Sequence, residues 1–284
     1  MVIELVLTLS CPDRPGLVAD VAGAVVAFQG NIVEASQFND METDRFFMRV
    51  RFALSADAEA PFRAALEALA RGHQLDWELR RTDAVRKVLM LASNSGHCLG
   101  DLLYRNRIGE LAMDVVGIVS NHPRDALKIN LVGDIPFHHL PVTKETKSEQ
   151  EARIKQIVTD SGADLVILAR YMQILSDDLA SFLSGRCINI HHSFLPGFKG
   201  ARPYHQAHAR GVKMIGATAH YVTADLDEGP IIHQDVERIT HADSPADLIR
   251  KGRDIEKRVL AAAVQLHLED RVLLNGTKTI VFAK

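Results

Sequence analysis

The strongest constraint on the fold is the regular alternation of short apolar runs with amphipathic segments after residue 85. The run 165–169 is short and continuously apolar, which is typical of a central strand buried on both faces of a parallel sheet. Strands are predicted at 87–92, 113–119, 164–168 and 187–190, and helices at 97–106, 147–160 and 176–183. Because strands and helices alternate, we predict an α/β unit, Rossmann-like in plan, whose mostly parallel sheet is covered on both faces.

The elements that follow are predicted to complete this unit. Segments 213–223 and 230–237 are expected to extend the sheet as antiparallel strands. A long helix is expected from its cap Ser244 to about Asp270, because Pro245 suits the first helical position. Asn275 and Gly276 then predict a two-residue hairpin.

The first 82 residues follow a different plan, β-α-β-β-α-β. The alternating run 3–9 predicts the first strand, and Pro15 is expected to open a helix that ends at Gly30. The remaining elements are predicted as strands at 32–38, 45–54 and 75–79, a turn at 40–44 and a helix at 58–70. Two βαβ halves of this kind predict a ferredoxin-like sandwich.

Charge usage separates the two parts of the chain. Residues 1–82 contain 8 Arg, no Lys and 12 acidic residues, whereas residues 83–284 contain 25 basic and 24 acidic residues. The change coincides with a short polar linker that begins at Arg80. We therefore predict two domains, 1–82 and 83–284.

The composition argues against several classes of protein. The formal net charge is −3, which argues against a strongly basic surface for nucleic acid. No uninterrupted apolar stretch approaches the roughly 18–20 residues that span a bilayer. The first residues lack a basic segment and carry Glu4 inside the apolar run, so we interpret them as a strand and not as a signal peptide. We expect a cytoplasmic protein that binds neither nucleic acid nor membrane.

The cysteines and histidines do not predict a metal site. Cys11, Cys98 and Cys187 are far apart in the sequence, and we expect them to be buried thiols in a reducing cytosol. His205 and His208 share one side of a predicted helix, but a metal site needs more ligands than these two.

The densest polar cluster lies at the end of the strand predicted at 187–190. The side chains of Asn189 and His191 point the same way, because side chains alternate along a strand. They stand at its carboxyl end, where open α/β sheets bind ligands. A second polar patch contains Asp227, which we expect to meet the imidazole from a loop. Asn donates to an oxyanion, His donates or moves a proton, and Asp holds His or acts as a base, so this set predicts acyl chemistry.

Longer motifs around these residues give a family resemblance. The strings Ile188-Asn-Ile-His191-x-Ser193-x-Leu195-Pro196 and Gly216-Ala-Thr-Ala-His220-x-Val-Thr223-x-x-x-Asp227-x-Gly229-Pro230 resemble the 10-formyltetrahydrofolate-dependent formyltransferase family. The resemblance covers essentially all of residues 85–284. The run Cys11-Pro-Asp13-Arg14-Pro15-Gly16-Leu17-Val18 resembles the opening loop of an ACT domain. Within the family, an N-terminal domain of this type characterises the formyltetrahydrofolate deformylases.

The resemblance implies hydrolysis of 10-formyltetrahydrofolate to tetrahydrofolate and formate, which supplies formate for purine synthesis and balances the one-carbon folate pool. It implies that Asn189, His191 and Asp227 are catalytic, and it leaves open whether Asp227 or His191 is the general base. No cofactor is expected, because the folate is the substrate. A formyltransferase that acts on an amine is the alternative. The folate pocket is expected beside Met172, Gln173, Ile174 and Leu175.

The loop after the first strand of the second part bears on that alternative. A glycinamide ribonucleotide enzyme has a Gly/Ser/Asn-rich loop here that holds the substrate phosphate, whereas residues 93–99 keep one Gly and contain His97 and Cys98. Such a loop exposes its backbone N–H groups to phosphate less freely, which favours water as the acceptor. One Gly with flanking Ser can still bind an anion, so the loop does not decide between the two reactions.

The ACT resemblance implies a small amino-acid effector and a homo-oligomer. A domain that only dimerises the chain is the alternative. The effector site is expected at Asp13, Arg14, Gly16 and Leu17, with Asn31 opposite.

Some other polar residues near the motifs receive structural interpretations. His192 would point away from His191 if the strand continued, which predicts a structural role. His138 and His139 lie in a polar segment that is predicted to be an exposed loop or a mobile lid. Lys199 and Arg202 are expected to be exposed charges, with the anionic glutamate tail of folate as an alternative partner.

Overall fold

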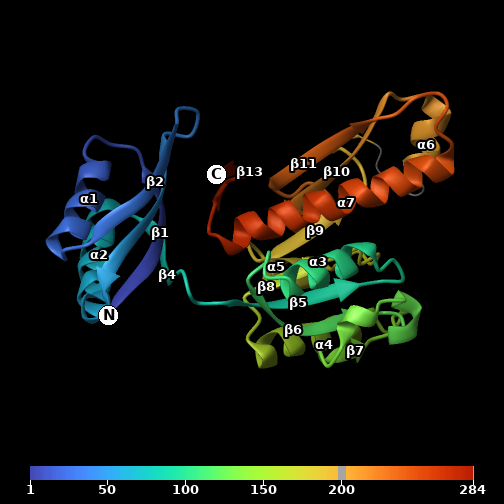
Figure 1. The fold of residues 1–284 in the computed structure, drawn as a ribbon, viewed down its shortest axis with the longest axis horizontal. Helices are drawn as coiled ribbons and strands as arrows, with labels where there is room; N and C mark the ends of the chain where they lie inside the picture. The colour runs from blue at the N-terminus through green and yellow to red at the C-terminus, as the bar shows by residue number, and fades with distance from the viewer. Residues whose placement is uncertain (198–202, 284) are drawn as a thin grey trace. The chain divides into compact units, whose positions relative to one another are not determined.

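The computed structural model describes residues 1–197 and 203–283 and divides the chain into two compact units (Figure 1). The first unit comprises Met1–Val85, Glu269–Asn275 and the chain from Thr279 onward. The second comprises Arg86–Leu268 and Gly276–Lys278. The sequence predicts a boundary after residue 82 with all that follows in the second domain, whereas in the structure residues 269–275 and 279–283 belong to the first unit.

The first unit is a four-stranded antiparallel sheet with two helices. Its strands are β1 (Val2–Pro12), β2 (Asn31–Asp40), β3 (Arg45–Ser55) and β4 (Asp76–Arg81), in the order β2-β3-β1-β4. Alternate residues of β1, such as Leu5 and Leu7, form a core with Val21 of α1 (Leu17–Ala27) and Phe62 of α2 (Glu59–His73). The predicted ferredoxin-like plan is confirmed. Helix α1 begins at Leu17 and not at Pro15, because Gly16 adopts a left-handed conformation (φ 96°) that interrupts the helical geometry.

Buried polar contacts attach the chain's end to the first unit. Arg271, just before β12 (Val272–Asn275), donates to Glu34 of β2 at 2.9 Å. Asn275 donates to Asp40 at 2.6 Å. Strand β12 pairs with β13 (Lys278–Val281). Their turn is therefore 276–277, one residue later than predicted. Polar contacts between distant residues hold this segment, and local sequence patterns do not show such contacts.

The second unit is built on a seven-stranded sheet. Five parallel strands are β5 (Arg86–Ala92), β6 (Met113–Ser120), β7 (Phe137–His139), β8 (Leu165–Leu168) and β9 (Cys187–His191). Strands β10 (Met214–Tyr221) and β11 (Ile231–Arg238) continue the sheet antiparallel, as predicted, in the order β11-β10-β9-β8-β5-β6-β7. Strand β7 was missed: the segment around His138 and His139 was predicted as a loop, and three residues are too few to show a period of two.

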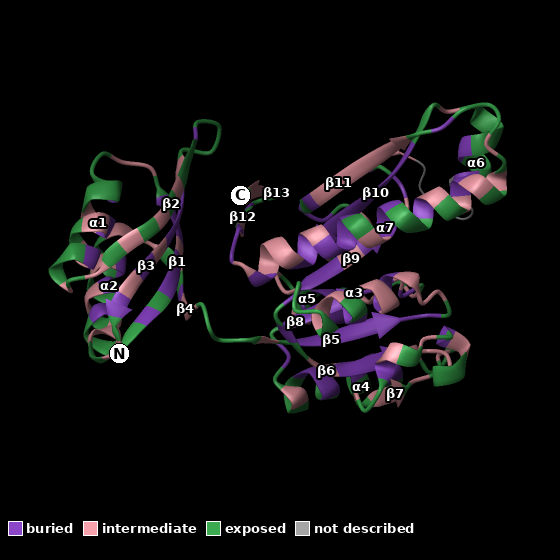
Figure 2. Cartoon of the chain, in the orientation of Figure 1, coloured by how far each residue is buried: buried purple, intermediate pink, exposed green. Residues whose placement is uncertain are grey.

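Helices cover both faces of this sheet. Leu89 and Leu91 of β5 pack with α4 (Lys147–Ser161) and α5 (Asp177–Phe182) on one face. On the other face α3 (His97–Arg107) contacts α7 (Pro245–Leu268), which also packs on β9 and β10 (Figure 1). The short helix α6 (Pro203–Arg210) contacts α7 as well. The central strands are consequently buried on both sides (Figure 2).

The direction of the strand order reverses between β5 and β8. The chain passes from β5 to β6 on one side, and it later returns to β8 on the other side of β5. The loops that follow β5 and β8 therefore diverge, which is the position where open α/β sheets bind ligands. Ser93 and Met172 lie in these two loops, and the Ser93 hydroxyl accepts the Met172 N–H at 2.9 Å.

Candidate active site

The three residues predicted to be catalytic meet in one pocket of about 220 Å³. Asn189 and His191 reach it from the last residues of β9, where the alternation of the strand turns both to the same side. Asp227 reaches it from the loop between β10 and β11, and its Oδ2 lies 3.2 Å from His191 Nδ1. The predicted convergence of amide, imidazole and carboxylate is thus present.

The contacts of His191 define its tautomer. A carboxylate accepts and does not donate, so Nδ1 carries the proton that faces Asp227. The other ring nitrogen, Nε2, is buried and has no hydrogen-bond partner among the residues that the structure describes. A buried polar atom without a partner is costly in a folded protein, and such atoms often mark functional positions. His191 Nε2 is therefore available to exchange a proton with a molecule in the pocket.

Asp227 is held as a carboxylate in a strained loop. Its backbone is left-handed (φ 58°), a conformation that is uncommon for residues other than glycine. Burial acts to raise the pKa of Asp227, but the hydrogen bond from His191 acts in the opposite direction, and the pKa lies well below its usual value. Gly229 lets the loop pack, because a Cβ atom there would collide with the carbonyl of Tyr221.

His220 orients the amide of Asn189, a role that the sequence analysis did not assign. His220 Nδ1 lies 2.9 Å from the Tyr221 carbonyl, which can only accept, so Nδ1 carries the proton. His220 Nε2 then accepts from Asn189 Nδ2 at 3.2 Å. One amide hydrogen of Asn189 is fixed in this way, and the second is left for a ligand. His220 stood in the motif that gave the resemblance, which was the signal available.

The loop after β8 lines the pocket as predicted. Met172, Gln173, Ile174 and Leu175 all contribute to its wall. Met172 and Ile174 are 53% and 60% exposed, so these two apolar side chains face solvent and are not part of the core. Exposed apolar side chains beside polar groups are typical of a wall that receives a flat, partly apolar ligand.

A buried polar network adjoins the pocket and was not predicted as a unit. Glu256 of α7 is 1% exposed and accepts from the Tyr204 hydroxyl at 2.6 Å. Arg170 lies between Glu256 (Nε to Oε2, 3.3 Å) and His192, whose Nδ1 is 2.7 Å from Arg170 Nη1. Burial acts to raise the pKa of Glu256, but the bond from His97 and the Arg170 charge outweigh it, so its pKa is lowered. Glu256 could have been noticed as an acid on the apolar stripe of α7.

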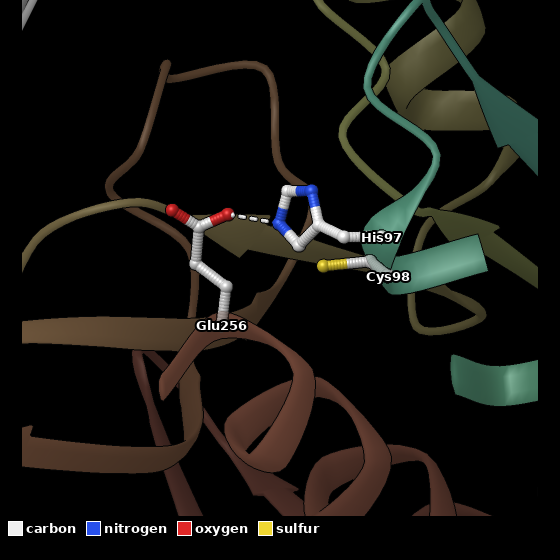
Figure 3. Close-up of side chains that lie close together, drawn as sticks. All are labelled: His97, Cys98 and Glu256. Carbon is white, nitrogen blue, oxygen red and sulfur yellow. Dashed lines mark hydrogen bonds and ion pairs between the residues drawn. The ribbon is translucent and has the colours of Figure 1, made fainter. Parts of the chain in front are cut away.

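Figure 3 shows His97 and Glu256 pointing at one another with Cys98 beside them, and the His97 Nε2 to Glu256 Oε2 distance is 2.7 Å. Among the described residues this is the group of His, Cys and acidic side chains compact enough to hold a metal ion. Both oxygens of Glu256 already accept hydrogen bonds, and burial raises the pKa of the Cys98 thiol well above its usual value. The cluster is therefore a hydrogen-bonded network and not an open coordination site.

The predicted effector residues do not all come together within one chain. Gly16 caps α1, Leu17 is in the core, and Asp13 accepts from Asn39 at 2.7 Å. Asn31 pairs with Ala53 of β3, which in turn pairs with Glu4 at the other end of β1. That register places Asn31 about eight residues, or roughly 27 Å, along the strands from the Asp13 loop.

Family models match both units. The model described as an ACT domain matches residues 4–80, and the model described as formyl transferase matches residues 86–264. A formyltetrahydrofolate deformylase of Corynebacterium sp. (strain P-1) is 49% identical over 97% of this chain and 97% of the relative. The chain belongs to the formyltetrahydrofolate deformylase family. The Escherichia coli (strain K12) member is 39% identical over 97% of each chain.

Solved structures agree with this membership. A formyltetrahydrofolate deformylase from Burkholderia mallei has a TM-score of 0.93 and 50% identity, and the match covers 99% of this chain and 100% of that one. A glycinamide ribonucleotide transformylase from Symbiobacterium toebii has a TM-score of 0.66 and 29% identity, and it covers 72% of this chain and 98% of its own. The likeness to the deformylase family therefore extends over a larger part of this chain than the likeness to the transformylase does.

Three further predictions concern the cysteines, membrane-spanning helices and two basic residues. The three cysteines are free and buried, as expected. Within the described ranges, no helix is long and apolar enough to cross a membrane. Lys199 and Arg202 lie outside the described residues.

Proposed function

We propose that this member of the deformylase family hydrolyses 10-formyltetrahydrofolate to tetrahydrofolate and formate. The observation that carries the proposal is the convergence of Asn189, His191 and Asp227 in a pocket whose wall is the exposed loop 172–175. The full-length match to formyltetrahydrofolate deformylases supports it. The formate released is available for purine synthesis. Transfer to an amine, the alternative considered from the sequence, is not favoured.

The reaction follows from the three side chains. The oxygen of a water molecule bonds to the formyl carbon, and the formyl oxygen becomes an oxyanion. The amide N–H of Asn189 that His220 leaves free donates to this oxyanion. The carbon–N10 bond then breaks, N10 receives a proton, and formate and tetrahydrofolate leave.

The proton is moved by His191 in this proposal. Asp227 is a weak base because its pKa lies far below the working pH, and general bases work best when the two values are close. His191 Nε2, which no described residue contacts through a hydrogen bond, takes the proton of the attacking water. The resulting imidazolium is stabilised by Asp227 and returns the proton to N10.

The decisive assay contains the full-length protein and 10-formyltetrahydrofolate without any amine. We expect formate and tetrahydrofolate to appear in equal amounts at every time point. Turnover only after addition of an amine acceptor would refute hydrolysis and support transfer.

The residue assignments are tested with Asn189→Ala, His191→Ala and Asp227→Ala. Each is expected to lower kcat at least about tenfold, since loss of one oxyanion donor alone costs roughly 10²–10³ in rate. Thermal unfolding monitored by circular dichroism provides the check on folding. Near-normal turnover in a folded variant would remove that residue from the mechanism.

We propose that no cofactor or metal takes part. Both oxygens of Glu256 are occupied in the described cluster that most resembles a metal site. Dialysis against a chelator should leave kcat unchanged, and addition of zinc should not raise it. A loss of turnover that added metal restores would contradict this.

We propose that the first unit binds a small amino acid near the Asp13–Leu17 loop and that the chain forms a homo-oligomer. We also propose that the protein works in the cytoplasm. The ACT match and the three free cysteines support these points. Isothermal titration of the full chain with the common small amino acids, and sedimentation with and without them, test the first two. Absence of binding by all of them would favour a unit that serves assembly only.

A further inference from the structure

His191 and His192 present two imidazoles to the same pocket with different partners. Their rings are stacked, with centroids 4.9 Å apart and an angle of 24° between planes. The expectation that His192 points away from His191 is not met, because β9 ends at His191 and the chain bends there. His191 Nδ1 faces a carboxylate, Asp227, whereas His192 Nδ1 faces a guanidinium, Arg170.

The partner of His192 determines where its proton sits. Arg170 has only donors, so its Nη1 donates to His192 Nδ1 at 2.7 Å and Nδ1 must be the unprotonated nitrogen. The ring proton is then on Nε2. Among the described residues no group accepts from Nε2, and His192 lines the pocket together with Asn189 and His191. His192 thus offers one fixed N–H donor.

Arg170 is held by its backbone conformation, by Glu256 and by His192. Its backbone is left-handed (φ 64°), and its side chain contacts Glu256 of α7. Glu256, pinned by His97 and Tyr204, lies 3.3 Å from Arg170 Nε and balances its charge. Strain that is stabilised by a buried network is a common property of functional sites.

We infer that His192 is a second hydrogen-bond donor to the oxyanion, with its tautomer fixed by Arg170 and the buried Glu256 network. The inference rests on the proposed hydrolysis, in which His191 moves the proton. A neutral imidazole is suited to this task because it donates without exchanging its proton during the cycle, as in other enzymes that use a neutral His as an electrophile. His191 and His192 therefore divide the work: one ring transfers a proton and the other holds the oxygen.

The charges around His192 agree with this role. Burial first, then the charges of Arg170 and His191, lower the pKa of His192 to about 4. It therefore stays neutral between pH 5.5 and 8. The titratable and charged groups that face His192 come from every element packed against it. They are Arg170 of the loop after β8, His191 of β9, Tyr204 of α6, Asp227 of the loop after β10 and Glu256 of α7.

The test compares His192→Asn with His192→Gln. Asn keeps an acceptor at the position of Nδ1 for Arg170 but has no donor at the position of Nε2, whereas Gln places an amide N–H near Nε2. If His192 donates to the oxyanion, His192→Asn lowers kcat about 10²-fold and leaves KM within about threefold of the wild-type value. The kcat of His192→Gln is then at least about tenfold higher than that of His192→Asn. The exposed His241→Asn serves as the matched control and should keep wild-type kcat.

A purely structural His192 predicts the opposite order. In that case His192→Asn, which preserves the hydrogen bond from Arg170, retains the wild-type kcat and His192→Gln does not. Either this order or an equal loss of kcat in both variants would overturn the inference. Imidazole NMR of the wild-type protein gives an independent readout. We expect His192 to be the Nε2–H tautomer without titration between pH 5.5 and 8, and titration in that range would equally overturn it. Formate release by the wild type tests the proposed hydrolysis separately.

Discussion

Asn189 Nδ2 lies 3.2 Å from His220 Nε2, and this contact fixes the orientation of an amide that lines the pocket. His220 is 2% exposed and is itself held by the Tyr221 carbonyl. A buried imidazole thus determines which way the Asn189 amide is turned. The arrangement places the second donor hydrogen toward the pocket before any substrate binds, which is the condition for effective oxyanion stabilisation.

Substitution of His220 should reduce catalysis through Asn189. We expect His220→Leu to lower kcat ten- to a hundredfold, because small misplacements of a catalytic group have effects of that order. His220→Gln provides an oxygen acceptor near the position of Nε2 and should recover most of the rate. Steady-state formate release measures both variants, and thermal unfolding shows whether each is folded. Equal rates in the Leu and Gln variants would show that the acceptor is unimportant.

Glu256 should make stability depend on pH in the acid range. Its pKa is lower in the folded protein than in the unfolded chain, where it is about 4.3. Its contribution is therefore fully present above pH 4.3 and is lost as the pH falls through the lower folded value. We expect Glu256→Gln to cost about 1.5–3 kcal/mol at pH 7 and progressively less below pH 4. Urea unfolding at several pH values measures this, and a cost that does not vary with pH would contradict it.

The sequence predicted those parts of the site that follow from local periodicity. Asn189 and His191 could be placed together because a strand repeats every two residues, and Asp227 because its motif was recognisable. Arg170 could not, because the left-handed turn that directs it has no sequence signature at a non-glycine residue. Glu256 carries a weak signal, a buried acid among apolar neighbours on α7, but its partners come from distant segments.

The fold shows the same limit. The long parallel strands were predicted nearly to the residue, because burial on both faces makes them continuously apolar. Strand β7 has three residues and no pattern of its own. The return of the chain's end to the first unit depends on pairs such as Arg271 with Glu34, which are 237 residues apart. Such contacts cannot be inferred from neighbouring residues.

Gly252 should be required on α7 for a steric reason. A Cβ atom there would collide with the ring and hydroxyl of Tyr204, the residue that donates to Glu256. We expect Gly252→Ala to destabilise the protein by about 1–3 kcal/mol through overpacking and to lower kcat. Gly100→Ala on α3 meets ordinary contacts only and should stabilise by about 0.5–1 kcal/mol. Thermal unfolding of the two variants should therefore shift in opposite directions, and parallel shifts would contradict the steric explanation.

Arg271 should stabilise the first unit. Its contact with Glu34 joins residues that are 237 positions apart, the largest separation among the polar contacts described above. Its side chain is 6% exposed and donates to Glu34, Glu269 and the carbonyl of Phe282. Arg271→Met leaves Glu34 with one fewer cation, and because Glu34 is 28% exposed, water limits the cost to about 1–3 kcal/mol.

The single tryptophan, Trp77, packs against the core of that unit, so its fluorescence during urea unfolding reports the effect. The matched control is Arg258→Met, which removes an exposed pair with Asp235 and should cost less than about 1 kcal/mol. If both variants unfolded at the same urea concentration, the chain's end would not be an energetic part of the first unit. A lower midpoint for Arg271→Met alone would show that contacts from residue 271 stabilise a domain whose sheet is complete within the first 81 residues.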